Sequence, residues 1–158
     1  MKKRIIAFSL AALLLLSGCS EIKADNPKDG NYATQNQNSA LEYGIYMNKQ
    51  IQVFINQISS RQAIARNINS GFNADNEVAL AEESIKTMQE TYDEVVTVNP
   101  SNGADDNRES TLTAMQTAID HMEGYRDAVK NRDSVDGYVK DFQNDFDQLT
   151  GLANFYNE

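Results

Sequence analysis

The stretch VALAEESIKTMQETYDEV, residues 78–95, decides the fold. Its apolar positions recur at steps of 3, 4, 3, 4 and 3, and they are Val78, Ala81, Ile85, Met88, Tyr92 and Val95. These steps place the side chains on one stripe of an α-helix, because the helix completes a turn in about 3.6 residues. A half-buried β-strand would instead alternate at every second residue. The stretch therefore predicts an amphipathic helix whose apolar seam packs against other helices.

Three further segments carry apolar residues at helical spacing and predict three more helices. The first segment runs from about residue 39 to 70, and its stripe comprises Leu41, Ile45, Met47, Ile51, Phe54, Ile55, Ile58, Ala65 and Ile68. The stripe before the last connection comprises Leu112, Met115, Ile119, Met122, Tyr125 or Arg126, and Val129. The last stripe comprises Val135, Tyr138, Val139, Phe142, Phe146, Leu149, Leu152, Phe155 and Tyr156.

Capping and turn residues separate these four segments. Ser70-Gly71 is a helix-stop signal, and Asn73 or Asp75 can cap the next helix. Asn99-Pro100 ends that helix, and Asp106 with Glu109 resembles a capping box. Asn131 to Asp133 reads as a tight turn with Asp133 or Ser134 as the following cap, although a bent continuous helix is the alternative. Residues 39–158 thus predict an all-α fold, an antiparallel up-down-up-down four-helix bundle.

Residues 1–18 have the pattern of a secretory signal peptide. A basic start, Met1 to Arg4, precedes a run from Ile5 to Leu16 that is apolar except for Ser9. This run is shorter than the roughly 20 residues that a membrane-spanning helix needs. It ends in Leu16-Ser17-Gly18-Cys19, which resembles the lipobox of bacterial lipoproteins.

The lipobox resemblance covers the signal alone and assigns a role to Cys19, the single cysteine of the chain. It implies a diacylglyceryl thioether on Cys19 and cleavage behind Gly18, so that the lipidated cysteine becomes the mature N-terminus. Two acyl chains anchor a protein stably, whereas one chain binds only marginally. A disulfide would need a second cysteine. An uncleaved N-terminal anchor is the alternative interpretation. The expected localisation is the extracytoplasmic face of the cell membrane.

Residues 19–38 form a polar stretch without apolar periodicity, which predicts a flexible tether with an r.m.s. reach of about 25 Å. The signal holds three of the 14 basic residues and none of the 23 acidic ones. The mature chain therefore carries 11 basic against 23 acidic residues, a net charge of −12. This charge argues against nucleic acid as a partner and against a body that lies flat on anionic lipid.

Candidate chemistry in the sequence is sparse. The single histidine, His121, falls between seam positions and is expected at the seam edge or facing outward; three residues before it stands Ala118, not the Glu of a di-iron bundle site. Two groups of carboxylates could hold Ca²⁺ or act as acid and base, and both are expected on solvated helix faces: Asp141 and Asp145 with Gln148 and Asp147, and Glu90, Asp93 and Glu94. The sequence predicts no catalytic residue, cofactor or metal site, and no enzyme.

Aromatic residues near the two ends of the bundle domain suggest a contact surface. Tyr43, Tyr46, Phe155 and Tyr156 would lie at the tether end of an up-down-up-down bundle and are the predicted interaction patch. Glycines beside aromatics, such as Gly44 and Gly124, could allow close helix approach or a ligand groove, and a local kink or a bundle end is the alternative. The sequence thus predicts a membrane-anchored interaction module of the cell envelope with an unidentified protein partner. The alternatives are a bundle that binds a small ligand or divalent ion, and a surface-exclusion or inhibitory lipoprotein.

Overall fold

The computed structural model describes residues 40–68, 73–100 and 107–157. It contains four helices: α1 (Ala40–Ala65), α2 (Ala74–Thr97), α3 (Arg108–Asn131) and α4 (Asp136–Phe155). The described ranges hold no strand, so the all-α prediction is confirmed. The predicted signal peptide, Cys19 and the tether lie outside these ranges and stay predictions.

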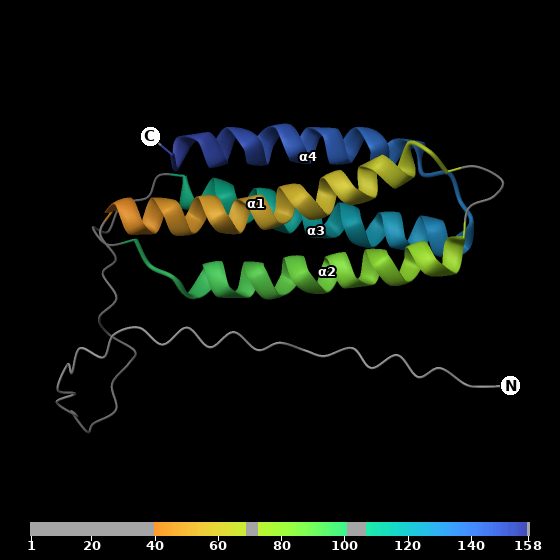
Figure 1. Ribbon diagram of the computed structural model, residues 1–158, viewed down its shortest axis with the longest axis horizontal. Helices are drawn as coiled ribbons and strands as arrows, with labels where there is room; N and C mark the ends of the chain where they lie inside the picture. The colour runs from red at the N-terminus through yellow and green to blue at the C-terminus, as the bar shows by residue number, and fades with distance from the viewer. Residues whose placement is uncertain (1–39, 69–72, 101–106, 158) are drawn as a thin grey trace, which may run out of the picture. The chain divides into compact units, whose positions relative to one another are not determined.

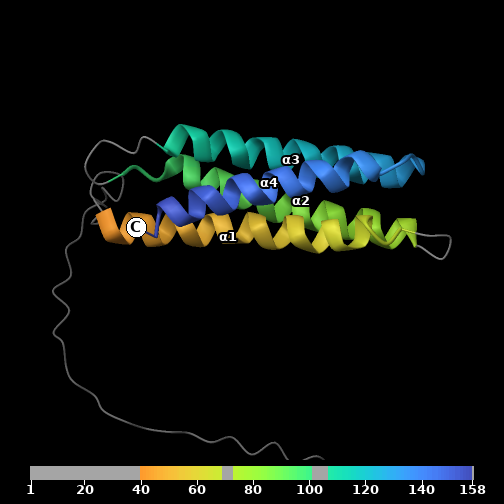
Figure 2. The ribbon, with the colours of Figure 1, turned by 90° about the horizontal axis from the view of Figure 1, so that it is seen from above.

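Successive helices run antiparallel, as Figures 1 and 2 show from two directions. Helix α1 packs most extensively against α4, and α2 packs most extensively against α3. The α3–α4 and α1–α2 interfaces join these two pairs into a bundle, and α1 touches α3 across the diagonal. The predicted up-down-up-down four-helix bundle is therefore confirmed.

The two ends of the bundle take their names from their place in the chain. The proximal end holds the start of α1 and α3 and the end of α2 and α4, and the distal end holds the opposite termini (Figure 1). None of the helices that the structure describes is long and apolar enough to cross a membrane.

Helix α1 ends at Ala65, five residues before the predicted Ser70-Gly71 stop, which lies outside the described residues. The reason lies in Asn67, whose side-chain Nδ2 donates to the carbonyl of Ala63 at 2.7 Å while its backbone N–H donates to Ile64 at 2.8 Å. These bonds satisfy carbonyls that continued helix would otherwise occupy. Across the loop, Asn73 caps α2 as predicted, because its side chain accepts from the N–H of Asn76 at 3.1 Å.

The connection between α3 and α4 is a turn, so the two helices are separate. Arg132 adopts a left-handed conformation, with φ 60° and ψ 33°, and its N–H donates to Val129 at 3.2 Å. The N–H of Asp133 donates to Ala128 at 2.9 Å, which completes a Schellman pattern usually built around glycine.

Two predicted helix starts need correction. Val135, not Asp133 or Ser134, occupies the N-cap of α4, although the Ser134 hydroxyl accepts from the N–H of Asp136 at 3.4 Å. Asn107 occupies the N-cap of α3, and Asp106 of the predicted capping box lies outside the described residues. Both observed caps lie one or two residues after the predicted ones, at Asn107 and Val135.

The core is a continuous apolar layer contributed by all four helices. Its largest fully buried side chains are Tyr125, Phe54, Phe142, Met47, Ile51, Ile58, Met88, Met115, Ile119, Met122, Leu149 and Val95. Tyr125, not Arg126, takes the open seam position of α3. Burying this apolar surface at about 25 cal/mol per Å² is what holds the helices together.

The seam of α2 is rotated relative to the prediction. Its buried positions are Glu77, Ala81, Ser84, Met88, Thr91 and Val95, which step by 4, 3, 4, 3 and 4. The predicted members Val78, Ile85 and Tyr92 are partly buried and pack against the edge of the core. Polar residues thus fill every other buried position of α2, and α1 supplies partners for Glu77 and Ser84.

Candidate functional site

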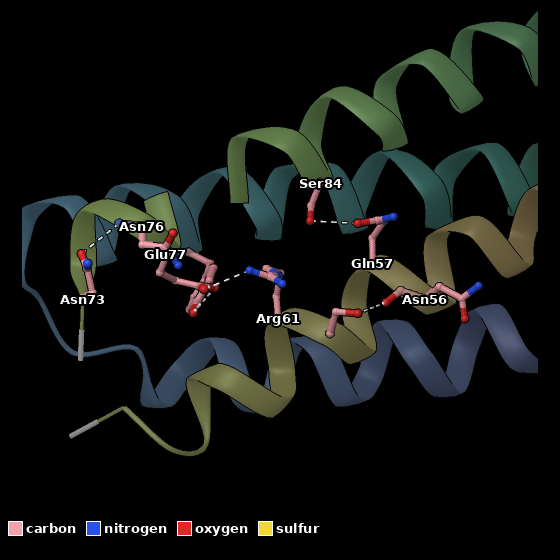
Figure 3. Close-up of polar contacts among 9 residues, drawn as sticks. Asn56, Gln57, Arg61, Asn73, Asn76, Glu77 and Ser84 are labelled. Carbon is pink, nitrogen blue, oxygen red and sulfur yellow. Dashed lines mark hydrogen bonds and ion pairs between the residues drawn. The ribbon is translucent and has the colours of Figure 1, made fainter. Parts of the chain in front are cut away.

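A buried ion pair with a tyrosine donor joins three helices near the distal end. Arg61 of α1 and Glu77 of α2 form a salt bridge of 2.9 Å between Nη1 and Oε2, shown in Figure 3. The hydroxyl of Tyr125 on α3 donates to the other carboxylate oxygen, Oε1, at 2.9 Å. Glu77 and Tyr125 are both buried, and the ring of Tyr125 meets Phe142 of α4 edge to face at 5.3 Å. This cluster therefore involves all four helices.

Burial and the carboxylate of Glu77 together raise the pKa of Tyr125 far above its ordinary value, and the charge of Arg61 lowers it in part. Tyr125 therefore stays protonated and serves as a hydrogen-bond donor. Arg61 Nε is buried without a hydrogen-bond partner in the described part of the chain. Buried ion pairs of this kind are costly to desolvate, and their best-attested role is to fix the register of packed helices.

The same interface carries a second polar pair one step closer to the proximal end. Ser84 Oγ donates to Gln57 Oε1 at 2.9 Å (Figure 3). Gln57 lies four residues before Arg61 on α1, and Ser84 lies seven residues after Glu77 on α2. The α1–α2 interface is thus a ladder of matched polar side chains.

The single histidine pairs with a buried carboxylate across the α3–α4 interface. His121 Nδ1 lies 2.8 Å from Asp145 Oδ2, and Asp145 is 4% exposed. The expectation that Asp145 lies on a solvated helix face is therefore wrong, whereas His121 is partly exposed at the seam edge as expected. Burial raises the pKa of Asp145, and the hydrogen bond and charge of His121 oppose this rise. The imidazole therefore offsets part of the cost of burying this carboxyl group.

The carboxylates predicted on α2 behave as surface groups. Glu90, Asp93 and Glu94 are exposed, and Asp93 accepts from Gln89 at 2.9 Å. Among the residues that the structure describes, no group of three His, Cys, Asp or Glu side chains is placed to hold a metal ion.

Three of the four residues of the predicted interaction patch gather at the proximal end. The rings of Tyr43 and Tyr156 meet edge to face at 6.2 Å, and Phe155 meets Tyr156 at 5.3 Å. Tyr43 is buried in the core, and Tyr156 is partly buried. Tyr46 is partly buried on α1, where burial and the charge of Glu94 raise its pKa. Most of this patch therefore serves packing, and Phe155 is its exposed member.

Gly44 explains how the start of α1 and the end of α4 come together. A Cβ at this position would lie 2.9 Å from the backbone oxygen of Tyr156, so glycine permits an approach that alanine would obstruct. Beside it, Asn48 Nδ2 donates to the carbonyl of Ala153 at 2.8 Å. Of the roles that the sequence allows for this glycine, close helix approach is the one that the structure supports.

The exposed apolar side chains are a different set from the predicted patch. Leu41 and Ile45 were expected on the buried stripe of α1, but they are 73% and 60% exposed. The stripe instead continues from Met47 back to Tyr43 at the same step of four residues. That step was the signal that could have separated Leu41 and Ile45 from the core.

An open hollow lies at the distal end. It has a volume of about 560 Å³, with Ile68, Val129 and Val135 among its apolar lining and Asp75, Arg132 and Asp133 among its polar lining. Its size falls in the range of small-ligand sites.

Comparisons with protein-family models, curated proteins and solved structures found no match. A function for this chain therefore follows from its own residues. Those that the structure describes include paired polar groups that hold helices together and a set of exposed apolar side chains.

Proposed function

We propose that this chain is a lipoprotein, anchored through lipid on Cys19 at the extracytoplasmic face of the cell membrane, and that its bundle is a non-enzymatic interaction module of the envelope. The observation that carries the proposal is the sequence Leu16-Ser17-Gly18-Cys19 at the end of an apolar signal segment. The helical body that begins at Ala40 is consistent with it, because the described helices have a core of their own and no membrane-spanning stretch.

The polar contacts inside the bundle support an interaction role for its surface. Its buried polar pairs, Arg61 with Glu77 and His121 with Asp145, each link two helices, so they are engaged in holding the bundle. What the body offers to other molecules is therefore its surface. A protein partner in the envelope is the binding partner that we propose.

Changing Cys19 to Ser tests the anchoring. The variant precursor should stay uncleaved by the lipoprotein signal peptidase and should not incorporate labelled fatty acid, because the thiol is the only group that accepts the lipid. Ser17→Ala, which keeps a small residue in the lipobox, is the matched control and should be processed normally. Normal cleavage of the Cys19→Ser variant would rule out the proposed anchor.

Photo-crosslinking from intact cells tests the interaction role. A photoreactive residue at Ile64, which is exposed near the distal end of α1, should give a discrete protein adduct. The buried position Ile58 on the same helix serves as the control, because it faces the core. Adducts of equal yield from both positions would show non-specific capture and contradict the proposal.

Small-ligand binding is the second candidate function, and the hollow of about 560 Å³ at the distal end favours it. A ligand that occupies this hollow should raise the melting temperature of the wild-type bundle. Val129→Trp would fill the hollow and abolish the shift. A shift that persists in this variant would place the ligand elsewhere.

A further inference from the structure

The exposed apolar side chains of the bundle are unevenly distributed between its two ends. Within residues 40–68, 73–100 and 107–157, five large apolar side chains are exposed. Four of them lie at the proximal end, and they are Leu41, Ile45, Val96 and Phe155. The fifth, Ile64, is near the distal end and is the least exposed at 37%.

These four side chains come from three helices. Leu41 and Ile45 stand on the first two turns of α1, Val96 is in the last turn of α2 at 45% exposure, and Phe155 is the last residue of α4 at 48% exposure. Helix α1 packs against both α2 and α4, so the four side chains come from three neighbouring helices at one end of the bundle. A bilayer that meets this end of the bundle would contact all three helices at once.

We infer that the proximal end docks on the bilayer that holds Cys19, with these apolar side chains entering the interface between headgroups and acyl chains. The inference rests on the proposed lipid anchor and names the partner of this end. Apolar side chains beside a polar surface bind membranes in proportion to the apolar area that they bury.

The length and attachment of the chain outside the described residues favour this partner. Twenty residues separate Cys19 from Ala40, and they connect to the proximal end. A tether with the predicted reach of about 25 Å is shorter than α1, whose 26 residues extend about 39 Å. Such a tether gives the proximal end an effective concentration in the millimolar range at the bilayer. An intrinsic dissociation constant of about 1 mM would therefore suffice for frequent contact.

Charge restricts the kind of bilayer. The proximal end also exposes Asp93, Glu94 and Glu109, and the mature chain is acidic overall. Anionic headgroups would repel these carboxylates, and salt would weaken the repulsion. The docking should thus be strongest on neutral headgroups and should fall as anionic lipid is added.

Tryptophan fluorescence can test the docking, because the chain has no tryptophan and a single cysteine. The mature chain, residues 19–158, would be coupled through Cys19 to phosphatidylcholine vesicles that contain a trace of maleimide-headgroup lipid. Ile45→Trp and Ile64→Trp place the reporter at opposite ends of the same helix. Brominated phosphatidylcholine should quench the reporter at position 45 several-fold more than the reporter at position 64. Replacement by phosphatidylglycerol should reduce the difference at low salt.

Three results would overturn the inference. Equal quenching of the two reporters would mean that the proximal end does not enter the bilayer. A blue shift of the reporter at position 45 that grows with protein concentration without vesicles would identify a second copy as the occupant. A photoreactive residue at position 45 that captures protein rather than lipid in cells would identify a protein. Because Cys19 is coupled chemically in the vesicle experiments, the two fluorescence outcomes are independent of whether cells acylate it, which the Cys19→Ser experiment decides.

A second pair of variants separates docking from stability. With Phe155→Trp as reporter, Leu41→Ser combined with Ile45→Ser should lower quenching several-fold without changing the melting temperature, since both residues are exposed. Ile64→Ser should change neither quantity. Unchanged quenching in the Leu41→Ser, Ile45→Ser variant would show that these side chains do not mediate the contact.

Discussion

The interfaces within the two helix pairs differ from those between the pairs. Within the pairs α1–α4 and α2–α3 the helices pack most extensively, and the polar side chains there form hydrogen bonds without an oppositely charged partner, as from Asn48 to Ala153, from Gln62 to Gln143 and from Tyr125 to Glu77. Between the pairs lie the contacts of Glu77 with Arg61 and of Asp145 with His121, and Glu77 and Asp145 are the two buried carboxyl groups of the described residues. Glu77 meets a guanidinium and Asp145 an imidazole, each on a helix of the other pair.

This difference separates two tasks in the bundle. Packing within the pairs buries most of the apolar surface. It is compatible with many relative positions (registers) of the helices, because one apolar side chain can replace another of similar size. Matched polar groups between the pairs tolerate few registers, because sliding one pair along the other would separate Glu77 from Arg61. We expect the polar interfaces to specify how the pairs meet and the apolar interfaces to supply the stability.

Glu77→Leu should have the largest effect on stability. It leaves the guanidinium of Arg61 buried without its counterion and should cost about 3–5 kcal/mol in the free energy of unfolding. The double variant Arg61→Met, Glu77→Leu should recover part of this loss, because both charges are gone while the buried Tyr125 hydroxyl still lacks its acceptor. Urea unfolding followed by circular dichroism measures each value.

A truncation within the apolar part of the core provides the contrast. Leu149→Ala removes a fully buried side chain and should cost about 2–5 kcal/mol by leaving a cavity. Adding Arg61→Met to it should give no recovery. If Arg61→Met, Glu77→Leu were as unstable as Glu77→Leu alone, the polar interface would be supplying stability, and the proposed division of tasks would be wrong.

Gly44→Ala tests the closeness of the α1–α4 pair. The new Cβ would lie 2.9 Å from the backbone oxygen of Tyr156, which cannot rotate away, so the helices must separate. We expect a loss of about 1–3 kcal/mol. Gly151→Ala is the control, because nothing lies within 4 Å of its Cβ, and it should gain about 0.5–1 kcal/mol from helix propensity. Equal effects of the two substitutions would show that α1 and α4 can accommodate the additional methyl group at this point.

How much of this arrangement the sequence could predict depends on the range of the interactions. The helical period predicted four helices, because apolar spacing is a local property. The short connections between the segments predicted their antiparallel order. In α2, however, the set Val78, Ile85 and Tyr92 and the set Glu77, Ser84 and Thr91 are both spaced by seven residues. Choosing the polar set required knowing that Arg61 and Gln57 face it from α1.

The candidate site depended still more on distant partners. Asp145 has the sequence context of a solvated face, and its burial becomes reasonable only once His121, 24 residues earlier, lies 2.8 Å away. The exposed pair Leu41 and Ile45 could have been separated from the core by extending the stripe of Met47 back to Tyr43. Lipid on Cys19 remains a prediction that the sequence alone supports.

Asp145→Asn tests the α3–α4 polar pair through its pH dependence. Burial raises the pKa of Asp145 above its ordinary value of 3.8, with His121 opposing the rise. A carboxyl whose pKa is raised by folding binds its proton more tightly in the folded state, so its contribution to stability is present below the unfolded pKa and is lost as the pH rises through the folded pKa. The stability of the wild type relative to Asp145→Asn should therefore fall as the pH rises above about 3.8, by about 1.4 kcal/mol for each unit of the shift.

Urea unfolding at a series of pH values measures this difference. Asp147→Asn removes an exposed carboxylate from the same helix and controls for the loss of one negative charge. A difference that rises with pH would mean that His121 overcompensates burial and that the paired carboxylate stabilises the fold.

Arg132→Gly should have the smallest effect, and it tests the turn that joins one pair to the other. Arg132 is the one residue other than glycine with positive φ among those described, and a left-handed conformation costs such a residue about 1 kcal/mol. Glycine should regain this amount, because it adopts the conformation without a clash between Cβ and the next carbonyl. Arg132→Ala removes the same charge but keeps the Cβ, so the glycine variant should be the more stable of the two in urea unfolding. Equal stabilities would mean that the turn is not strained, and that the Schellman bonds from Arg132 and Asp133 rather than backbone preference determine where α3 ends.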